Sequence, residues 1–147
     1  MLRIKTILHP TDFSESAEHA LQLACSLARD HGSKLVLLTV PAPPLPSVET
    51  YIPEYELSQL MKESEQQLKS VADGIEDVSV ETRVIAGEPG WAIVTAASDC
   101  QADLIVMGTH GRKGLSRLLM GSVAEHVLRH APCPVLTVKP TGTLPKD

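Results

Sequence analysis

The chain has 147 residues, of which 43% are hydrophobic, and its formal net charge is −5 with an isoelectric point near 5.6. This length suits one domain with its own core, and the acidic balance excludes the basic surface that nucleic acid requires. The sequence shows neither a run of membrane-spanning length nor a signal-peptide pattern, and Cys25, Cys100 and Cys133 lie in no metal-binding or CxxC spacing. We therefore expect a cytoplasmic protein, not embedded in a membrane, whose cysteines are small core residues.

The first 40 residues predict a strand, a helix and a second strand. Residues 4–9 have the character of a strand that Pro10 ends, and small apolar residues then recur at helical spacing over residues 17–28. Gly32 is placed to stop that helix in a left-handed conformation. Residues 35–40 form a short apolar run, typical of a strand that is buried on both faces.

The middle of the chain begins with a proline-rich stretch, residues 41–53, which fits neither a helix nor a sheet. This stretch is either a lid over a site or a simple connection. Over residues 54–75 apolar side chains recur on one helical stripe, in which Met61 is expected to be a core residue. Residues 78–85 alternate apolar and polar side chains, as a half-exposed edge strand does.

The last third repeats this alternation, with a helix that begins at Pro89, a buried strand at Leu104–Gly108 and a final strand at Val135–Val138. Strands that alternate with helices predict an α/β fold with a parallel sheet and right-handed crossovers. We expect one domain over residues 1–140 and a disordered tail over residues 141–147.

A glycine-rich loop follows the predicted strand at Leu104–Gly108. Its glycines, among them Gly111, would let backbone amides approach an anion, and Ser122 with Glu125 three residues later has the pattern of a capping box at a helix start. Exposed amides at a helix N-terminus bind phosphate. Taken alone, each glycine is more simply explained by turn geometry and Ser122 by helix capping, so it is the combination that indicates phosphate.

The spacing within this loop matches a known signature in full. Residues 108–122 fit the pattern G-x2-G-x9-G-[ST], and the chain therefore resembles the ATP-binding branch of the universal stress protein family. The resemblance extends over residues 7–138 and includes the segments 8–14 and 132–136, although His9 stands where the family usually has an apolar residue. It implies a single-domain, doubly wound, five-stranded parallel sheet of order 3-2-1-4-5, with helices on both faces.

In such a sheet, ligands bind beyond the strand ends where the strand order reverses, which groups the loop after the first strand with the glycine-rich loop. The amides and the helix start suit phosphates, whereas the Asp12 carboxylate suits ribose hydroxyls or an exocyclic amine, beside apolar walls from Val40 and Met107. Without the signature, Asp12 would be interpreted as a helix cap, and Arg112 as a solvated loop charge. The nucleotide-binding residues that the resemblance implies are Pro10, Thr11, Asp12, Val40, Met107, Gly108, Gly111, Arg112, Gly121, Ser122 and Val123.

Three functions stay open at this point. The first is a regulatory stress-response module that binds ATP or AMP, with or without Mg²⁺ or Mn²⁺, and whose occupancy tunes oligomerisation or partner binding. The second is a slow ATPase or phosphotransferase in which His110 is the base. The third is a structural dimer that binds no nucleotide. The sequence has no P-loop, GxGxxG or kinase motif, which excludes the other common phosphate-binding classes.

The final predicted strand, Val135–Val138, would be an exposed apolar edge, and such edges are usually paired or covered. Members of the family commonly pair there, so the resemblance implies a homodimer through this strand, with a tetramer as the alternative. It also implies a regulated protein partner, such as a transporter.

Overall fold

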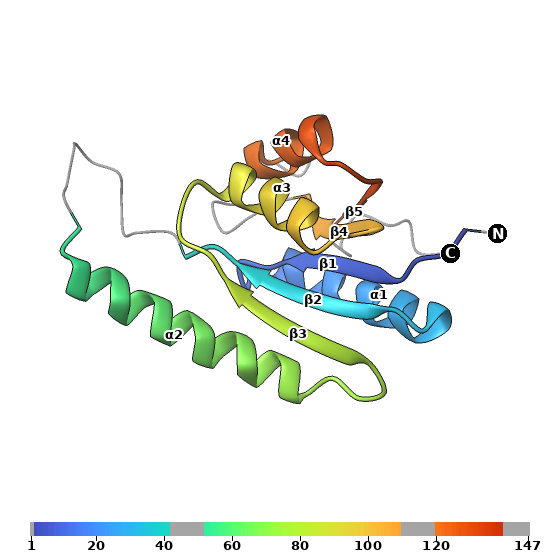
Figure 1. Cartoon of the computed structure of the whole chain (residues 1–147), viewed down its shortest axis with the longest axis horizontal. Helices are drawn as coiled ribbons and strands as arrows, with labels where there is room; N and C mark the ends of the chain where they lie inside the picture. Colours follow the sequence, from blue (N-terminus) through green and yellow to red (C-terminus); the bar gives the residue numbers. More distant parts are fainter. Residues whose placement is uncertain (1, 42–51, 110–119, 140–147) are drawn as a thin grey trace.

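The structure is a computed structural model that describes residues 2–41, 52–109 and 120–139. The described residues form five strands and four helices in alternation (Figure 1). Their bounds are β1 Thr6–Pro10, α1 Glu15–His31, β2 Lys34–Thr39, α2 Glu54–Asp73, β3 Ser79–Val84, α3 Pro89–Asp99, β4 Leu104–Gly108, α4 Ser122–His130 and β5 Val135–Val138. Most of the proline-rich stretch and the predicted tail lie outside the described residues.

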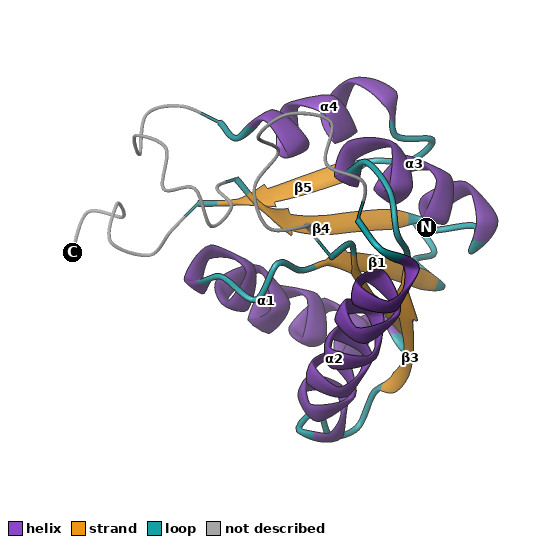
Figure 2. Ribbon diagram, turned by 90° about the vertical axis from the view of Figure 1, so that its left-hand side faces the viewer, coloured by secondary structure: helices purple, strands orange, loops and turns teal. Residues whose placement is uncertain are grey.

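The five strands form one parallel sheet in the order β3-β2-β1-β4-β5, which confirms the predicted topology. Figure 2 shows α1 and α2 on one face of this sheet and α3 and α4 on the other. Each face has its own core layer, because successive strand residues point to opposite sides. In β1, Ile7 packs into the layer under α1 and α2, and Leu8 packs into the layer under α3 and α4.

Local sequence signals set the ends of the first and third helices. The Ser14 hydroxyl accepts a hydrogen bond from the amide of Ala17 and so caps α1, whose far end stops at Gly32 with a φ of 65°. Glu88 caps α3 by accepting from the amides of Gly90 and Trp91. The predicted stop at Gly32 and the predicted start of a helix at Pro89 are therefore both confirmed.

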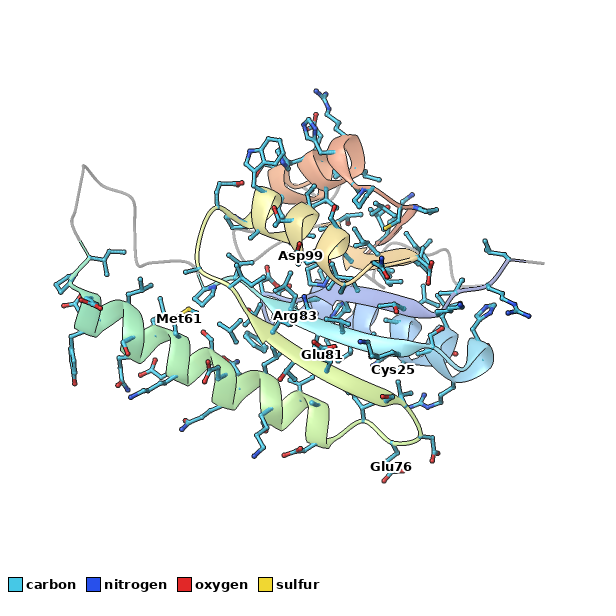
Figure 3. All side chains as sticks on the ribbon, in the orientation of Figure 1. Cys25, Met61, Glu76, Glu81, Arg83 and Asp99 are labelled. Carbon is cyan, nitrogen blue, oxygen red and sulfur yellow. The ribbon has the colours of Figure 1, made fainter. Side chains whose placement is uncertain are left out.

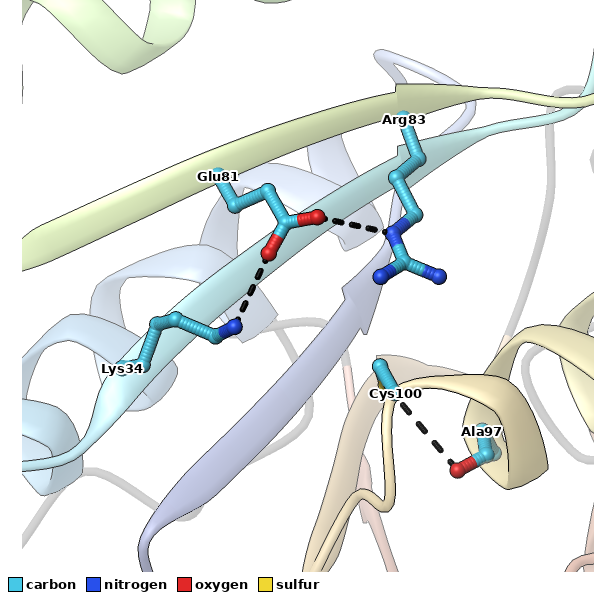
Figure 4. A network of polar contacts seen from close by, with 5 residues as sticks. All are labelled: Lys34, Glu81, Arg83, Ala97 and Cys100. Atoms are coloured by element: carbon cyan, nitrogen blue, oxygen red, sulfur yellow. Dashed lines mark hydrogen bonds and ion pairs between the residues drawn. The ribbon is translucent and has the colours of Figure 1, made fainter.

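The two outer strands of the sheet differ in their chemistry. On β3, Glu81 accepts hydrogen bonds from Lys34 of β2 at 2.9 Å and from Arg83 at 3.0 Å (Figure 4). These two hydrogen bonds lower the pKa of the Glu81 carboxyl. The predicted half-exposed edge strand is thus confirmed as β3, and this edge carries charged side chains. At the opposite edge β5 presents Leu136, which is 38% exposed.

The helix α2 contributes less to the core than its apolar stripe predicts. Ser64 and Leu68 are buried, and Met61 lies on the side of the helix that faces the sheet (Figure 3), where it is half-buried. Tyr55, in the first turn of this helix, is exposed.

On the other face, α3 and α4 pack through an aromatic cluster. The ring of Trp91 lies 4.5 Å from the ring of His126 and 5.0 Å from that of His130, measured between ring centroids. Beneath it, Gly90 comes so close to His126 that a Cβ at this position would lie 2.6 Å from Cδ2 of the imidazole. The absence of a side chain at Gly90 therefore sets how closely these two helices approach.

Two local predictions are wrong. Ser122 is the first residue of α4 and not its cap; the cap is Gly121, which has no side chain, and Glu125 pairs with Arg129 at 2.8 Å instead of closing a capping box. The first strand also includes Pro10, whereas the prediction placed its last residue at His9. Pro10 is the last residue of β1 and pairs with Leu38 of β2, because that neighbour does not need the amide hydrogen that proline lacks.

Candidate functional site

The candidate site lies where the two central strands end. The chain leaves β1 and later returns on its two sides, first as β2 and then as β4, so the strand order reverses between β1 and β4. In doubly wound sheets this reversal opens a crevice beyond the carboxyl ends of the strands. Thr11 and Asp12 follow β1, and Gly108 ends β4, so the predicted residues from both strands lie at this edge of the sheet.

The loop after β1 is held by its own hydrogen bonds. The amide of Thr11 donates to the carbonyl of Leu38 at 2.8 Å, and the Thr11 hydroxyl accepts from the amide of Phe13. Oδ1 of Asp12 accepts from the amide of Ser14 at 2.9 Å, while Phe13 has a φ of 62°. Asp12 therefore shapes the turn that precedes α1 and does not cap the helix. A positive φ at a non-glycine residue is uncommon and often accompanies a functional site.

Gly108 is fixed by the close approach of α1 to the end of β4. A Cβ built at Gly108 would overlap the hydroxyl of Ser16 and lie 3.0 Å from the carbonyl oxygen of the same residue. Because part of this contact is with the backbone, rotation of the Ser16 side chain would not relieve it. The first glycine of the signature is thus required by packing, whatever ligand the site takes.

The two ends of the glycine-rich loop meet. The amide of Thr109 donates to the carbonyl of Val138 at 3.2 Å, and the amide of Gly121 donates to the carbonyl of Thr109 at 2.7 Å. The first hydrogen bond within α4 runs from the amide of Glu125 to Gly121. The amides of the three preceding residues therefore have no acceptor within the helix and point beyond its N-terminus, as at any helix start. Ser122, the first of them, is exposed beside the end of β4.

The remaining predicted residues divide between the crevice and the core. Pro10 is buried at the end of β1, and Met107 is buried in the core layer under α3 and α4, with Val40 and Val123 packed partly buried against the same layer. Gly111 and Arg112 lie outside the described residues, as does His110 of the hydrolase alternative. The described part of the site thus combines a turn with one carboxylate, an apolar layer and a helix N-terminus.

His9 is a residue to which the sequence assigned no role. It is fully buried, and its Nδ1 lies 2.8 Å from the carbonyl oxygen of Val106 on β4. Burial lowers the pKa of His9 to about 4, although the hydrogen bond to Val106 and the charge of Asp12 act in the opposite direction. The imidazole is therefore neutral at physiological pH. Its position directly before a proline in a central strand is the signal in the sequence that could have identified it.

The described part of the chain holds neither a candidate metal cluster nor a thiol with a lowered pKa. No group of three or more His, Cys, Asp or Glu side chains that could hold a metal ion occurs among residues 2–41, 52–109 and 120–139. Burial raises the pKa of the thiols of Cys25, Cys100 and Cys133, and Cys100 lies 3.9 Å from the carbonyl of Ala97 (Figure 4). The assignment as a core residue is confirmed for Cys25, whereas Cys100 and Cys133 are partly buried at the margin of the core. None of the helices in the described ranges is long and apolar enough to cross a membrane.

Comparison with known proteins agrees with the fold and with the signature. Residues 3–139 match the model of the universal stress protein family. A universal stress protein of Methanocaldococcus jannaschii is 40% identical over 142 residues, covering 92% of this chain and 82% of that protein.

Solved structures of related proteins match the fold over most of the chain. The structure of the protein MJ0577 of the same archaeon matches with a TM-score of 0.79 and 34% identity, covering 93% of this chain and 96% of the other. A universal stress protein in complex with cAMP matches with a TM-score of 0.64 and 27% identity, covering 95% and 99% of the two chains. The extent of these matches, together with the sheet order and the signature, shows that the chain belongs to the universal stress protein family.

Proposed function

We propose that this protein binds an adenine nucleotide, ATP or AMP, in the crevice between β1 and β4, and that occupancy regulates its assembly or its binding to a partner in the cytoplasm. One observation carries the proposal: the hydrogen bond from Gly121 to Thr109 holds the N-terminus of α4 beside the end of β4. The partial positive charge of a helix N-terminus attracts phosphate.

The two sides of the crevice support one orientation of the nucleotide. Asp12 is a carboxylate, which repels phosphate but accepts hydrogen bonds from ribose hydroxyls or from the exocyclic amine of adenine. The phosphates then lie at α4, near Ser122, and the adenosine lies at the loop after β1. The related structure in complex with cAMP supports an adenine nucleotide as the ligand class.

The experiment uses a substitution that strengthens the helix while it opposes the ligand. Aspartate at the exposed position of Ser122 interacts favourably with the helix dipole, so Ser122→Asp should keep or raise the melting temperature. The same carboxylate repels a bound phosphate and should weaken ATP binding by about tenfold or more. Ser122→Ala is the matched control and should weaken ATP binding only a few-fold.

Isothermal titration calorimetry with ATP, AMP and adenosine, each with and without Mg²⁺ or Mn²⁺, provides the measurement. Adenosine binding should change little in Ser122→Asp, because adenosine has no phosphate. No heat and no thermal shift for the wild-type protein with any of these ligands would overturn the proposal. An assay of phosphate release in the same samples tests the alternative of slow hydrolysis.

A further inference from the structure

The hydrogen-bonded pairing between β1 and β4 ends before these two strands do. The pairing of β1 with β4 ends at Leu8 and Ile105, whereas the pairing of β1 with β2 continues to Pro10 and Leu38. The pairing of β4 with β5 also continues, as far as Gly108 and Val138. The ladder between β1 and β4 is therefore interrupted at the end of the sheet where the proposed nucleotide site lies.

Proline accounts for this interruption. Along a strand, successive amides point alternately to the neighbours on either side. The amide of Thr11 donates to Leu38 of β2, so the backbone nitrogen of Pro10 faces β4. The amide of Ile105 donates to Pro134, on the side of β5, so the backbone of Val106 faces β1. The next bond of the ladder would run from residue 10 to the carbonyl of Val106, and proline has no hydrogen to donate.

The side chain of His9 supplies the missing donor. Its Nδ1 lies 2.8 Å from the carbonyl oxygen of Val106, and because a carbonyl can only accept, Nδ1 carries the proton. The contact is fully buried, where an unpaired carbonyl would be unfavourable. In the neutral ring Nε2 is then an unprotonated acceptor, and it has no hydrogen-bond partner among the described residues.

We infer that His9 is a positioning residue of the nucleotide site, whose imidazole replaces the missing amide of Pro10 and holds the end of β4 against β1. The inference rests on the proposed function. Ser16 of α1 also packs on the end of β4, at Gly108. The end of β4 is thus held at two points, and the position of Gly108 relative to Asp12 depends on both. An apolar side chain at position 9 leaves the carbonyl of Val106 unpaired and frees this strand end.

Three variants separate the hydrogen bond from the shape of the side chain. His9→Leu removes the donor, and His9→Asn keeps one, because the asparagine amide nitrogen is joined to Cγ as Nδ1 is in histidine. The double variant His9→Leu with Pro10→Ala restores a backbone amide that can donate to Val106, and Pro10→Ala alone is its reference. Nucleotide affinity is measured by calorimetry with ATP, and the cycle gives the coupling between the two positions.

We expect His9→Leu to weaken ATP binding by about tenfold, and His9→Asn by no more than about threefold. The double variant should bind within about threefold of Pro10→Ala. Two results overturn the inference: equal ATP binding by wild type and His9→Leu, or a His9→Asn variant that binds as weakly as His9→Leu. Neither result contradicts the proposed function. If His9→Leu is too unstable to assay, the double variant decides: binding like Pro10→Ala supports the inference, and weak binding overturns it.

Nitrogen NMR of the histidine rings gives a readout that does not depend on nucleotide. For His9 we expect a protonated Nδ1 and an unprotonated Nε2 at neutral pH, and the opposite tautomer overturns the inference whatever the affinities are. A wild-type protein that binds no adenine nucleotide overturns both the proposed function and this role in it, even if the tautomer is as expected. The two failures are therefore distinguishable.

Discussion

Gly90 of α3 lies against the imidazole of His126 of α4 so closely that a Cβ would come within 2.6 Å of Cδ2 and 2.8 Å of Cγ. Trp91 and His130 pack on the same ring, so it cannot shift without disturbing these contacts. The approach of the two helices that cover one face of the sheet therefore depends on this pair.

We predict that Gly90→Ala destabilises the protein by about 1–3 kcal/mol, since overpacking must move either the ring or the helix. Gly74→Ala is the matched control. Its Cβ would lie 3.5 Å from the nearest atom, the carbonyl oxygen of Val71, at ordinary contact distance. Urea unfolding, followed by the fluorescence of the single tryptophan, measures both. Adding His126→Ala to Gly90→Ala should recover part of the loss, and a Gly90→Ala protein as stable as wild type would contradict the prediction.

The burial of His9 makes stability depend on pH. Its pKa is about 4 in the folded protein and 6.5 in the unfolded chain, so the unfolded chain binds the extra proton between these values. The contribution of His9 to the free energy of unfolding is therefore fully present above pH 6.5 and is lost as the pH falls towards 4. The loss amounts to about 3 kcal/mol.

Urea unfolding at several pH values in this window, for wild type and for His9→Asn, isolates the effect. The difference in unfolding free energy between the two proteins should shrink as the pH falls. Other groups, such as Glu81, titrate alike in both proteins and cancel. A constant difference from pH 7 to pH 4.5 would show that His9 does not titrate in this way.

Asp12 should affect binding and stability through different atoms. Asn at this position keeps an oxygen that accepts from the amide of Ser14, but it removes the negative charge. We expect Asp12→Asn to weaken adenosine and ATP binding by roughly tenfold while the melting temperature changes little. Asp12→Ala should lower both the affinity and the melting temperature, because it also removes the acceptor that holds the turn before α1. Unchanged adenosine affinity in Asp12→Asn would place the adenosine elsewhere.

The edge strand β5 is predicted to pair with its counterpart in a second copy. Leu136 is 38% exposed on this strand, and Leu128 of α4 is a similarly exposed apolar residue, at 42%, that is not part of the strand. Leu136→Lys should shift the protein from dimer to monomer in light scattering after gel filtration, whereas Leu128→Lys should not. A monomeric wild-type protein, or a dimeric Leu136→Lys variant, would argue against pairing through β5.

Continuous apolar runs made the two strands at Leu104–Gly108 and Val135–Val138 predictable to the residue, and the alternation of strands and helices gave the sheet. The errors lie where a distant partner decides. Ser122 has the composition of a cap, but the bond between Gly121 and Thr109 brings the chain into α4 one residue earlier. His9 has its partner 97 residues away, and a propensity scale carries no information about such a contact.

The unequal edges of the sheet limit how copies can join. The β3 side carries the ion pairs of Glu81 with Lys34 and Arg83, and charged side chains discourage a neighbouring strand from adding there. The β5 side is apolar. If two copies pair through β5, as predicted, each sheet uses its one apolar edge, and edge-to-edge growth then stops at the dimer.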